Sequence, residues 1–208
     1  MRNVLCDRST SVMKAVGPIC FVALTVLLMI TQVAAQRYFF ENVSVQHGLP
    51  ASKVYAALQD EFGLVWIGTE AGLASYDGNR ITNHGTQDGM APNGARSLLM
   101  DKDGRLWTGH LDGGITIHDG NTFTAYTLGE DMHSAITAMV QADDGSIWIA
   151  TAGHGAFRTN GPQGSGTVLP ADRFDEEQGL QTVLLTVMKL KDGRICFVED
   201  RGTLRSIA

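Results

Sequence analysis

The sequence is poor in cysteine and in basic residues. Of its three cysteines, Cys6 and Cys20 lie in the N-terminal region, so Cys196 is left without an internal disulfide partner and is expected to be a small core residue. Its 16 lysines and arginines stand against 22 acidic residues, which gives a formal net charge of −6. This balance argues against a nucleic acid partner, because phosphate binding needs a basic face.

The motifs of an enzyme or of a metal site are also missing. The glycine-rich stretch at 164–166 is not the G-x-S-x-G motif of a serine hydrolase. The acidic turns at 101–104 and 143–145 lack the later acidic ligand of an EF-hand loop. The six histidines have no H-x-x-x-H or Cys/His spacing, which disfavours zinc. We therefore expect no catalytic residue, no metal and no cofactor in this chain.

One apolar run, at 15–30, is somewhat short for a bilayer span. Lys14 precedes it, and 33–35 follows with small residues at the −3 and −1 positions of a cut before Gln36. This layout predicts a secretory signal peptide over 1–35, with Met13 as a second plausible start. The mature chain is then exported to the periplasm or the extracellular face of the membrane. An uncleaved membrane anchor is the alternative.

Tryptophan and glycine, by contrast, recur at a fixed interval. Trp66, Trp107 and Trp148 are each 41 residues apart. Each follows a turn that ends in glycine, and these repeated glycines are Gly63, Gly104 and Gly145. A repeat of this length in a β-rich context predicts the blades of a β-propeller. One tryptophan per blade at constant phase favours packing between neighbouring sheets, although an exposed indole that stacks on a sugar is the alternative.

Each repeat reads as four short antiparallel strands, so the expected fold class is all-β. The blade units are predicted at about 49–89, 90–130, 131–179 and 180–208, and Cys196 takes the tryptophan position of the last unit. An insert at 160–170 in the third unit reads as a surface loop.

The two ends of the repeat array look complementary. Residues 39–48 align, 41 residues back, with the end of the first unit and predict an extra outer strand, whereas the last unit has three strands. These ends could close a ring of four blades. We favour an N-terminal fragment of a larger propeller, because repeat arrays need a clear closure or cap. Residues 36–208 by themselves are then expected to aggregate or to dimerise through exposed blade faces.

The first unit resembles the repeat of the two-component regulator propeller family. The residues that carry the resemblance are Asp60, Gly63, Trp66-Ile-Gly-Thr69, Gly72-Leu73 and Tyr76-Asp77-Gly78, with Gly48-Leu49-Pro50 before them. The resemblance implies the extracytoplasmic sensor of a membrane-bound receptor, with a propeller of about seven blades. It also implies an effector, most often a histidine kinase, downstream in the same polypeptide, so that this chain itself is not an enzyme.

Residues that break the repeat are the better candidates for a ligand site. In a propeller, the loops between second and third strands and the connections to the next blade open on one face. The candidate ligand-binding residues in these segments are Asn93, His110, Asp112, His133, His154 and Asp200. Polar loop residues that are merely solvated are the alternative.

We expect the chain to bind a small extracellular ligand, with a glycan as one candidate, and we keep a homodimer open. A secreted propeller enzyme, such as a lyase or hydrolase, and a protein-interaction platform are the competing readings.

Overall fold

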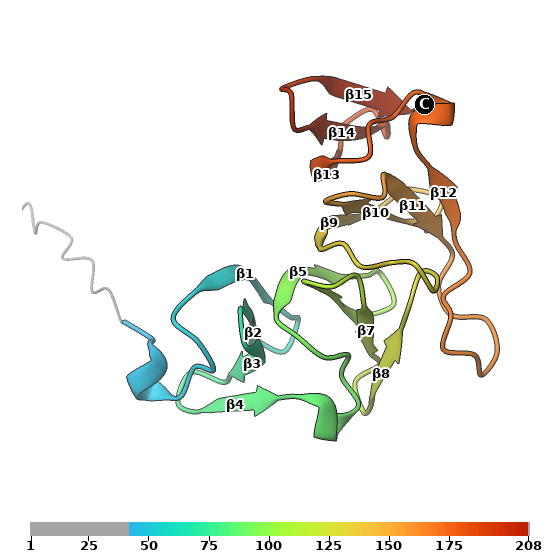
Figure 1. Cartoon of the computed structure of the whole chain (residues 1–208). Coiled ribbons are helices and arrows are strands. Elements are labelled where there is room, and N and C mark those ends of the chain that lie inside the picture. The colour runs from blue at the N-terminus through green and yellow to red at the C-terminus, as the bar shows by residue number, and fades with distance from the viewer. Residues whose placement is uncertain (1–41, 208) are drawn as a thin grey trace, which may run out of the picture. The chain divides into compact units, whose positions relative to one another are not determined.

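The computed structural model describes residues 42–207 (Figure 1). The predicted signal peptide over 1–35, the second start at Met13 and the cysteines Cys6 and Cys20 lie outside the described residues. Among residues 42–207, no helix is both long and apolar enough to cross a membrane.

The strands form four antiparallel sheets, and in each sheet the strands pair in sequence order. The first sheet contains β1 (Val54–Gln59), β2 (Val65–Thr69), β3 (Gly72–Tyr76) and β4 (Ile81–His84). The second contains β5 (Ala95–Met100), β6 (Leu106–His110), β7 (Ile115–His118) and β8 (Phe123–Tyr126). The third contains β9 (Ile136–Gln141), β10 (Ile147–Thr151), β11 (Ala156–Thr159) and β12 (Asp172–Phe174). The fourth contains β13 (Leu184–Lys189), β14 (Ile195–Glu199) and β15 (Leu204–Ile207). The predicted all-β propeller blades are confirmed.

Successive blades touch through their first strands. Strand β1 packs against β5, β5 against β9, and β9 against β13, and Figure 1 shows these four strands following one another along one side of the sheets. We call β1, β5, β9 and β13 the inner strands. Because each inner strand has a neighbour in the next blade, its side chains lie where two blades meet.

The three repeated tryptophans lie in the apolar cores between successive sheets. Trp66 packs with Met90 and Leu106 of the second blade. Trp107 packs with Ile136 and other residues of the third blade, and its exposed fraction is 0%. Trp148 is buried against residues of the fourth blade, among them Leu184, Val187 and Phe197. The indoles therefore pack between neighbouring blades, as their constant phase in the repeat predicts.

An aspartate at the start of the turn fixes the tryptophan in the first two blades. The Asp101 Oδ1 atom accepts backbone N–H groups from Asp103 at 3.0 Å and Arg105 at 2.9 Å, while Oδ2 accepts the Trp107 indole N–H at 2.8 Å. Asp60 binds its own turn and the Trp66 indole in the same way, at 3.1 Å to Nε1. One carboxylate thus satisfies both the turn and the buried indole, which explains why the two residue types occur six positions apart.

The insert at 160–170 is partly buried, so its prediction as a surface loop is wrong at its C-terminal end. Leu169 joins the core around Trp107 with an exposed fraction of 1%. Its N–H donates to the Thr127 carbonyl at 2.8 Å, and the Thr127 N–H donates to the Thr167 carbonyl at 2.9 Å. The middle of the insert, at 163–168, is exposed as expected. An apolar leucine near its end draws the loop back onto the second blade.

The predicted outer strand at 39–48 is not a strand where the structure describes it. Val45–His47 forms a 3-10 helix, η1, closed by Gly48 with a φ of 108°. The equivalent helices η2 (Thr86–Asp88) and η3 (Glu176–Gln178) follow β4 and β12, the outer strands of the first and third blades. The alignment with the first unit is therefore right, but its C-terminal part corresponds to the helix after the strand. Residues 39–41 lie outside the described residues.

Candidate functional site

The loops that carry the predicted ligand residues are held by one hydrogen bond that recurs in all four blades. A backbone N–H of the loop between the second and third strands donates to the carbonyl of a residue just before the inner strand. The four pairs are Glu70 to Lys53 (3.0 Å), Leu111 to Gly94 (3.1 Å), Ala152 to Ala135 (3.0 Å) and Asp200 to Val183 (3.4 Å). The backbone of this face is thus repeated, and only its side chains vary.

The second blade brings together Asn93, His110 and Asp112. The Asn93 side-chain amide donates to Asp112 Oδ2. Asn93 itself has a φ of 70°, in the left-handed region that asparagine tolerates. The Asn93 carbonyl lies 3.3 Å from His110 Nδ1.

His110 is a structural residue. A carbonyl can only accept, so Nδ1 carries the proton, and Nε2 accepts from the Thr116 hydroxyl at 2.8 Å. The Thr116 oxygen in turn accepts the Ala91 N–H at 2.9 Å. Burial lowers the pKa of His110, which keeps the ring neutral. Both ring nitrogens are engaged within the blade, so this candidate has no free atom for a ligand.

Asp112 is the more open candidate in this cluster. Its Oδ1 atom is buried and has no hydrogen-bond partner among the described residues. Asn93 beside it is exposed. A donor from a ligand could reach this pair, since a buried carboxylate oxygen without a partner is costly.

The remaining candidates lie in other blades. His154 Nδ1 contacts the Ser134 hydroxyl at 2.8 Å, and Ser134 occupies the position of Asn93 one repeat later. His133 is exposed in the segment before β9. Asp200 is also exposed and lines a cavity of about 360 Å³ with Gln181 and Arg201. The structure therefore gathers half of the six predicted residues and leaves the other half apart.

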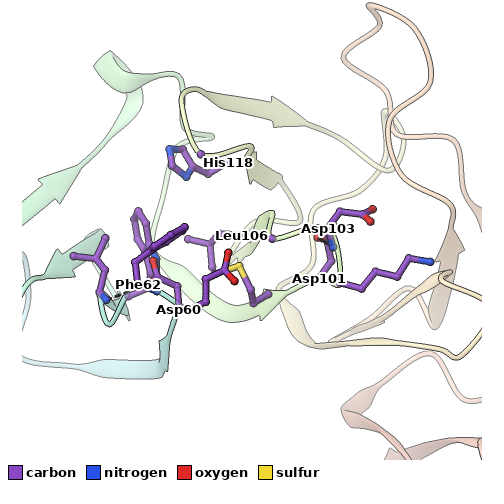
Figure 2. A pocket seen from close by; sticks show the side chains of 13 residues that line it. Asp60, Phe62, Asp101, Asp103, Leu106 and His118 are labelled. Carbon is purple, nitrogen blue, oxygen red and sulfur yellow. Dashed lines mark hydrogen bonds between the residues drawn. The ribbon is translucent and has the colours of Figure 1, made fainter.

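A second candidate site lies at the opposite end of the strands, between the first two blades. Figure 2 shows this cavity of about 500 Å³, lined by Asp60 and Phe62 of the first blade and by Asp101, Asp103 and His118 of the second. Phe62 is 88% exposed at the tip of its turn. The other three turns have aspartate at this position, so the break in the repeat could have been read from the sequence.

The aromatic floor of this cavity is made by Trp66 and His118, which pack with His84 and Phe123, two residues that do not line the cavity themselves. Trp66 lies 5.5 Å from each of His84 and His118, ring centre to ring centre, and Phe123 lies 4.2 Å from His118. Burial lowers the pKa of both histidines. The rings are therefore neutral near pH 7 and pack as apolar groups.

Asp101, the buried acid of the cavity wall, uses its carboxylate to bind the turn and the Trp107 indole. Burial raises the pKa of Asp101, but hydrogen bonds from Trp107 and Arg105 outweigh it and hold that pKa below its usual range. Arg105 Nε lies 2.8 Å from the same carboxylate. Asp101 thus stays ionised and holds the turn, which does not suit it to exchange protons with a substrate. Among residues 42–207, no three His, Cys, Asp or Glu side chains are placed to hold a metal ion.

Comparison with known proteins identifies a repeat and a fold. The family model described as two component regulator propeller matches residues 48–71. No curated protein matches the chain in sequence.

Several solved structures share the fold. The extracellular domain assigned to a hybrid two component system of B. thetaiotaomicron is 16% identical with a TM-score of 0.66, and the match covers 81% of this chain and 25% of that one. The extracellular domain assigned to a one component system of the same organism is 14% identical with a TM-score of 0.65, covering 83% and 23%. A streptogramin B lyase is 17% identical with a TM-score of 0.59, covering 76% and 55%. At these identities the likeness shows the propeller fold, and the chain spans about a quarter of the first two structures.

Proposed function

Because this chain carries a two-component regulator propeller repeat, we propose that it is the extracytoplasmic, ligand-sensing segment of a membrane-bound signalling receptor. The observation that carries the proposal is the family match at 48–71, in a fold shared with extracellular domains assigned to one- and two-component systems. The effector, most simply a histidine kinase, follows in the same polypeptide. The segment itself is not an enzyme.

The arrangement of the blades suits a sensor. The repeated hydrogen bonds fix each loop to its own inner strand, so the backbone stays constant while exposed residues such as Asn93 vary between blades. A rigid frame with variable side chains lets a small extracellular ligand, such as a glycan, bind without rearranging the cores. Export by the signal over 1–35 places this face in the periplasm or outside the cell. Dimerisation of the receptor would carry ligand occupancy to the effector.

One specific observation favours a different class, a secreted propeller enzyme. The streptogramin B lyase shares the fold, and the match covers more than half of that chain. Catalysis needs an acid or base within hydrogen-bond reach of the substrate. In the loop cluster the best-placed imidazole, His110, has both nitrogens engaged. We therefore rank the enzyme, and a protein-interaction platform, below the sensor.

Two measurements test the proposal. The reading frame beyond residue 208 should encode a membrane span followed by a signalling effector. Alkaline phosphatase fused after residue 207 should be active in the bacterial periplasm, and deletion of 14–35 should abolish that activity. A cytoplasmic fusion product, or a frame that continues into a catalytic domain on the same side of the membrane, would contradict the sensor.

A further inference from the structure

All four inner strands carry a β-bulge at the same place. In β1, Val54 pairs with Thr69 and Ala56 with Gly68, so residue 55 is left without a partner in the ladder. The same skip occurs at residues 96, 137 and 185 in β5, β9 and β13. A bulge turns the extra side chain away from the regular alternation, and bulges recur beside binding sites. The propeller therefore offers one redirected side chain per blade where adjacent blades meet.

These bulge residues differ in chemistry from blade to blade. Thr137 donates its hydroxyl to the Ala150 and Leu184 carbonyls, at 3.1 and 2.9 Å, and so joins the third blade to the fourth. Leu185 is apolar and 53% exposed. The first two blades instead have Tyr55 and Arg96, and the guanidinium carbon of Arg96 lies 5.5 Å from the centre of the Tyr55 ring.

Within residues 42–207, Arg96 has no anionic partner. Its Nε atom is buried and makes no hydrogen bond, and no acid pairs with the guanidinium among the described residues. The usual arrangement in this acidic chain is different, since five other arginines form ion pairs with carboxylates: Arg105, Arg158, Arg173, Arg194 and Arg205. A half-buried guanidinium that lacks such a partner has lost hydration without gaining a counter-charge.

A second cation stands beside the same ring. Lys53 Nζ lies 5.1 Å from the centre of the Tyr55 ring and 3.5 Å from Glu70 Oε1. A hydrogen bond to Tyr55 and the charge of Glu70 raise the pKa of Lys53, so the ammonium stays charged. One carboxylate for two cations leaves a net charge of about +1 around Tyr55.

We propose that Tyr55, Arg96 and Lys53 form a binding site for the carboxylate group of a small extracellular acid. Stacking on the ring holds the guanidinium plane, and its terminal N–H groups can then take a planar carboxylate through two parallel hydrogen bonds. Within a glycan this group would be a sugar acid. The role of this site as a sensor of acids rests on the function proposed above. The binding of a carboxylate by Arg96 does not depend on that function.

Calorimetry on the full chain in detergent tests this site with D-glucuronate, and with D-glucose as the same ring without the carboxylate. Glucuronate should bind and glucose should not. Arg96→Gln should weaken glucuronate binding by about 10-fold or more, because a charge-assisted bidentate contact is lost. Arg80→Gln, which removes an exposed arginine elsewhere in the first blade, should leave binding unchanged. High salt should weaken binding by the wild type.

A second variant separates a loss of binding from a loss of folding. Arg96→Lys keeps the charge but not the planar fork, so it should bind glucuronate with intermediate affinity and melt at the wild-type temperature. Equal binding of glucose and glucuronate, no loss in Arg96→Gln, or binding of sulfate without glucuronate would each overturn the proposal. If the alkaline phosphatase fusion is not exported but glucuronate still binds, the sensor function is contradicted and the carboxylate site stands.

Discussion

The first two blades and the last two share one backbone plan but use it differently. In the first two, the inner bulges present Tyr55 and Arg96 together, and the turns enclose a cavity with an exposed Phe62. In the third blade, the hydroxyl of the bulge residue Thr137 donates to the Leu184 carbonyl of the fourth blade. A repeated backbone can thus keep the same bulge and the same loop hydrogen bond in every blade while its side chains differ.

The turns show the same contrast. Asp60 and Asp101 bind the buried indoles of their blades, but residue 142 is alanine and residue 190 is leucine. In the third blade, Arg158 lies 5.8 Å from the Trp148 ring and is held by Asp144 at 2.7 Å. In the fourth, where the acid is absent, cysteine replaces tryptophan. The carboxylate acceptor is thus specific to the first two blades, and the third blade keeps its tryptophan without it.

The largest expected effect is that of Trp107→Ala. This side chain has an exposed fraction of 0% in the core between the second and third blades, so truncation should lower the free energy of unfolding by about 3–5 kcal/mol. Urea denaturation of the full chain measures the change. An unchanged denaturation midpoint would mean that the indole does not pack between blades.

Asp101→Ala should cost about 2–3 kcal/mol, because it leaves the buried Trp107 N–H and the turn N–H groups without an acceptor. Asp192→Ala is the control: this residue lies in the equivalent turn of the fourth blade, at the position of Asp103, and its exposed carboxylate pairs with Arg194. It should cost clearly less than Asp101→Ala, because an exposed ion pair is screened by water. Equal losses in the two variants would contradict the special role of the acid in the first blades.

The aromatic floor of the first cavity predicts a pH dependence. Burial lowers the pKa of His84 and His118 in the folded chain, against which Asp88 and Asp119 act only weakly. The unfolded chain therefore takes up protons first as the pH falls below about 6.5, and stability decreases from there downward. The melting temperature of His118→Phe should fall less between pH 7 and pH 5 than that of the wild type.

The exposed His133 provides the control for this experiment. His133→Phe should retain the full pH dependence, because its imidazole does not pack in the aromatic floor. A His118→Phe profile that coincides with the wild-type profile would show that this floor does not sense protons.

The smallest expected effect is that of Phe62→Asp, which restores the residue present in the other three turns. Because Phe62 is 88% exposed, its replacement should change the free energy of unfolding by no more than about 0.5 kcal/mol. Thermal unfolding of both proteins measures this difference. A loss comparable to that of Asp101→Ala would show that the ring is part of the core.

The repeated strands of the blades could be predicted from the sequence. The prediction failed where the fold depends on a single contact that does not repeat. A 41-residue period in tryptophan and glycine is sufficient to place the strands, since each blade solves the same packing problem. The burial of Leu169 depends on a contact with another blade, which no local pattern encodes. The end of the predicted outer strand is instead the helix η1, which Gly48 closes at a φ of 108°.

The candidate site was harder to predict for the same reason. The polar residues that break the repeat include Asn93 and Asp112, whose side chains form a hydrogen bond. They also include His110, whose two ring nitrogens bond to residues of its own blade. Tyr55 and Arg96 were missed because a bulge depends on strand register, and register is invisible in a single strand. Aligning the repeats would have shown tyrosine, arginine, threonine and leucine at one position, which is the available signal.

The most direct test of this account is the mapping of amide chemical shifts in the full chain as glucuronate is added. If recognition lies at the inner bulges of the first two blades, the largest changes should cluster at residues 53–55 and 94–97, with Glu70 beside them. In Arg96→Gln these changes should need a glucuronate concentration about 10-fold higher or more. Changes concentrated in β9 and β13, or the same changes in Arg96→Gln at the same concentrations, would contradict it.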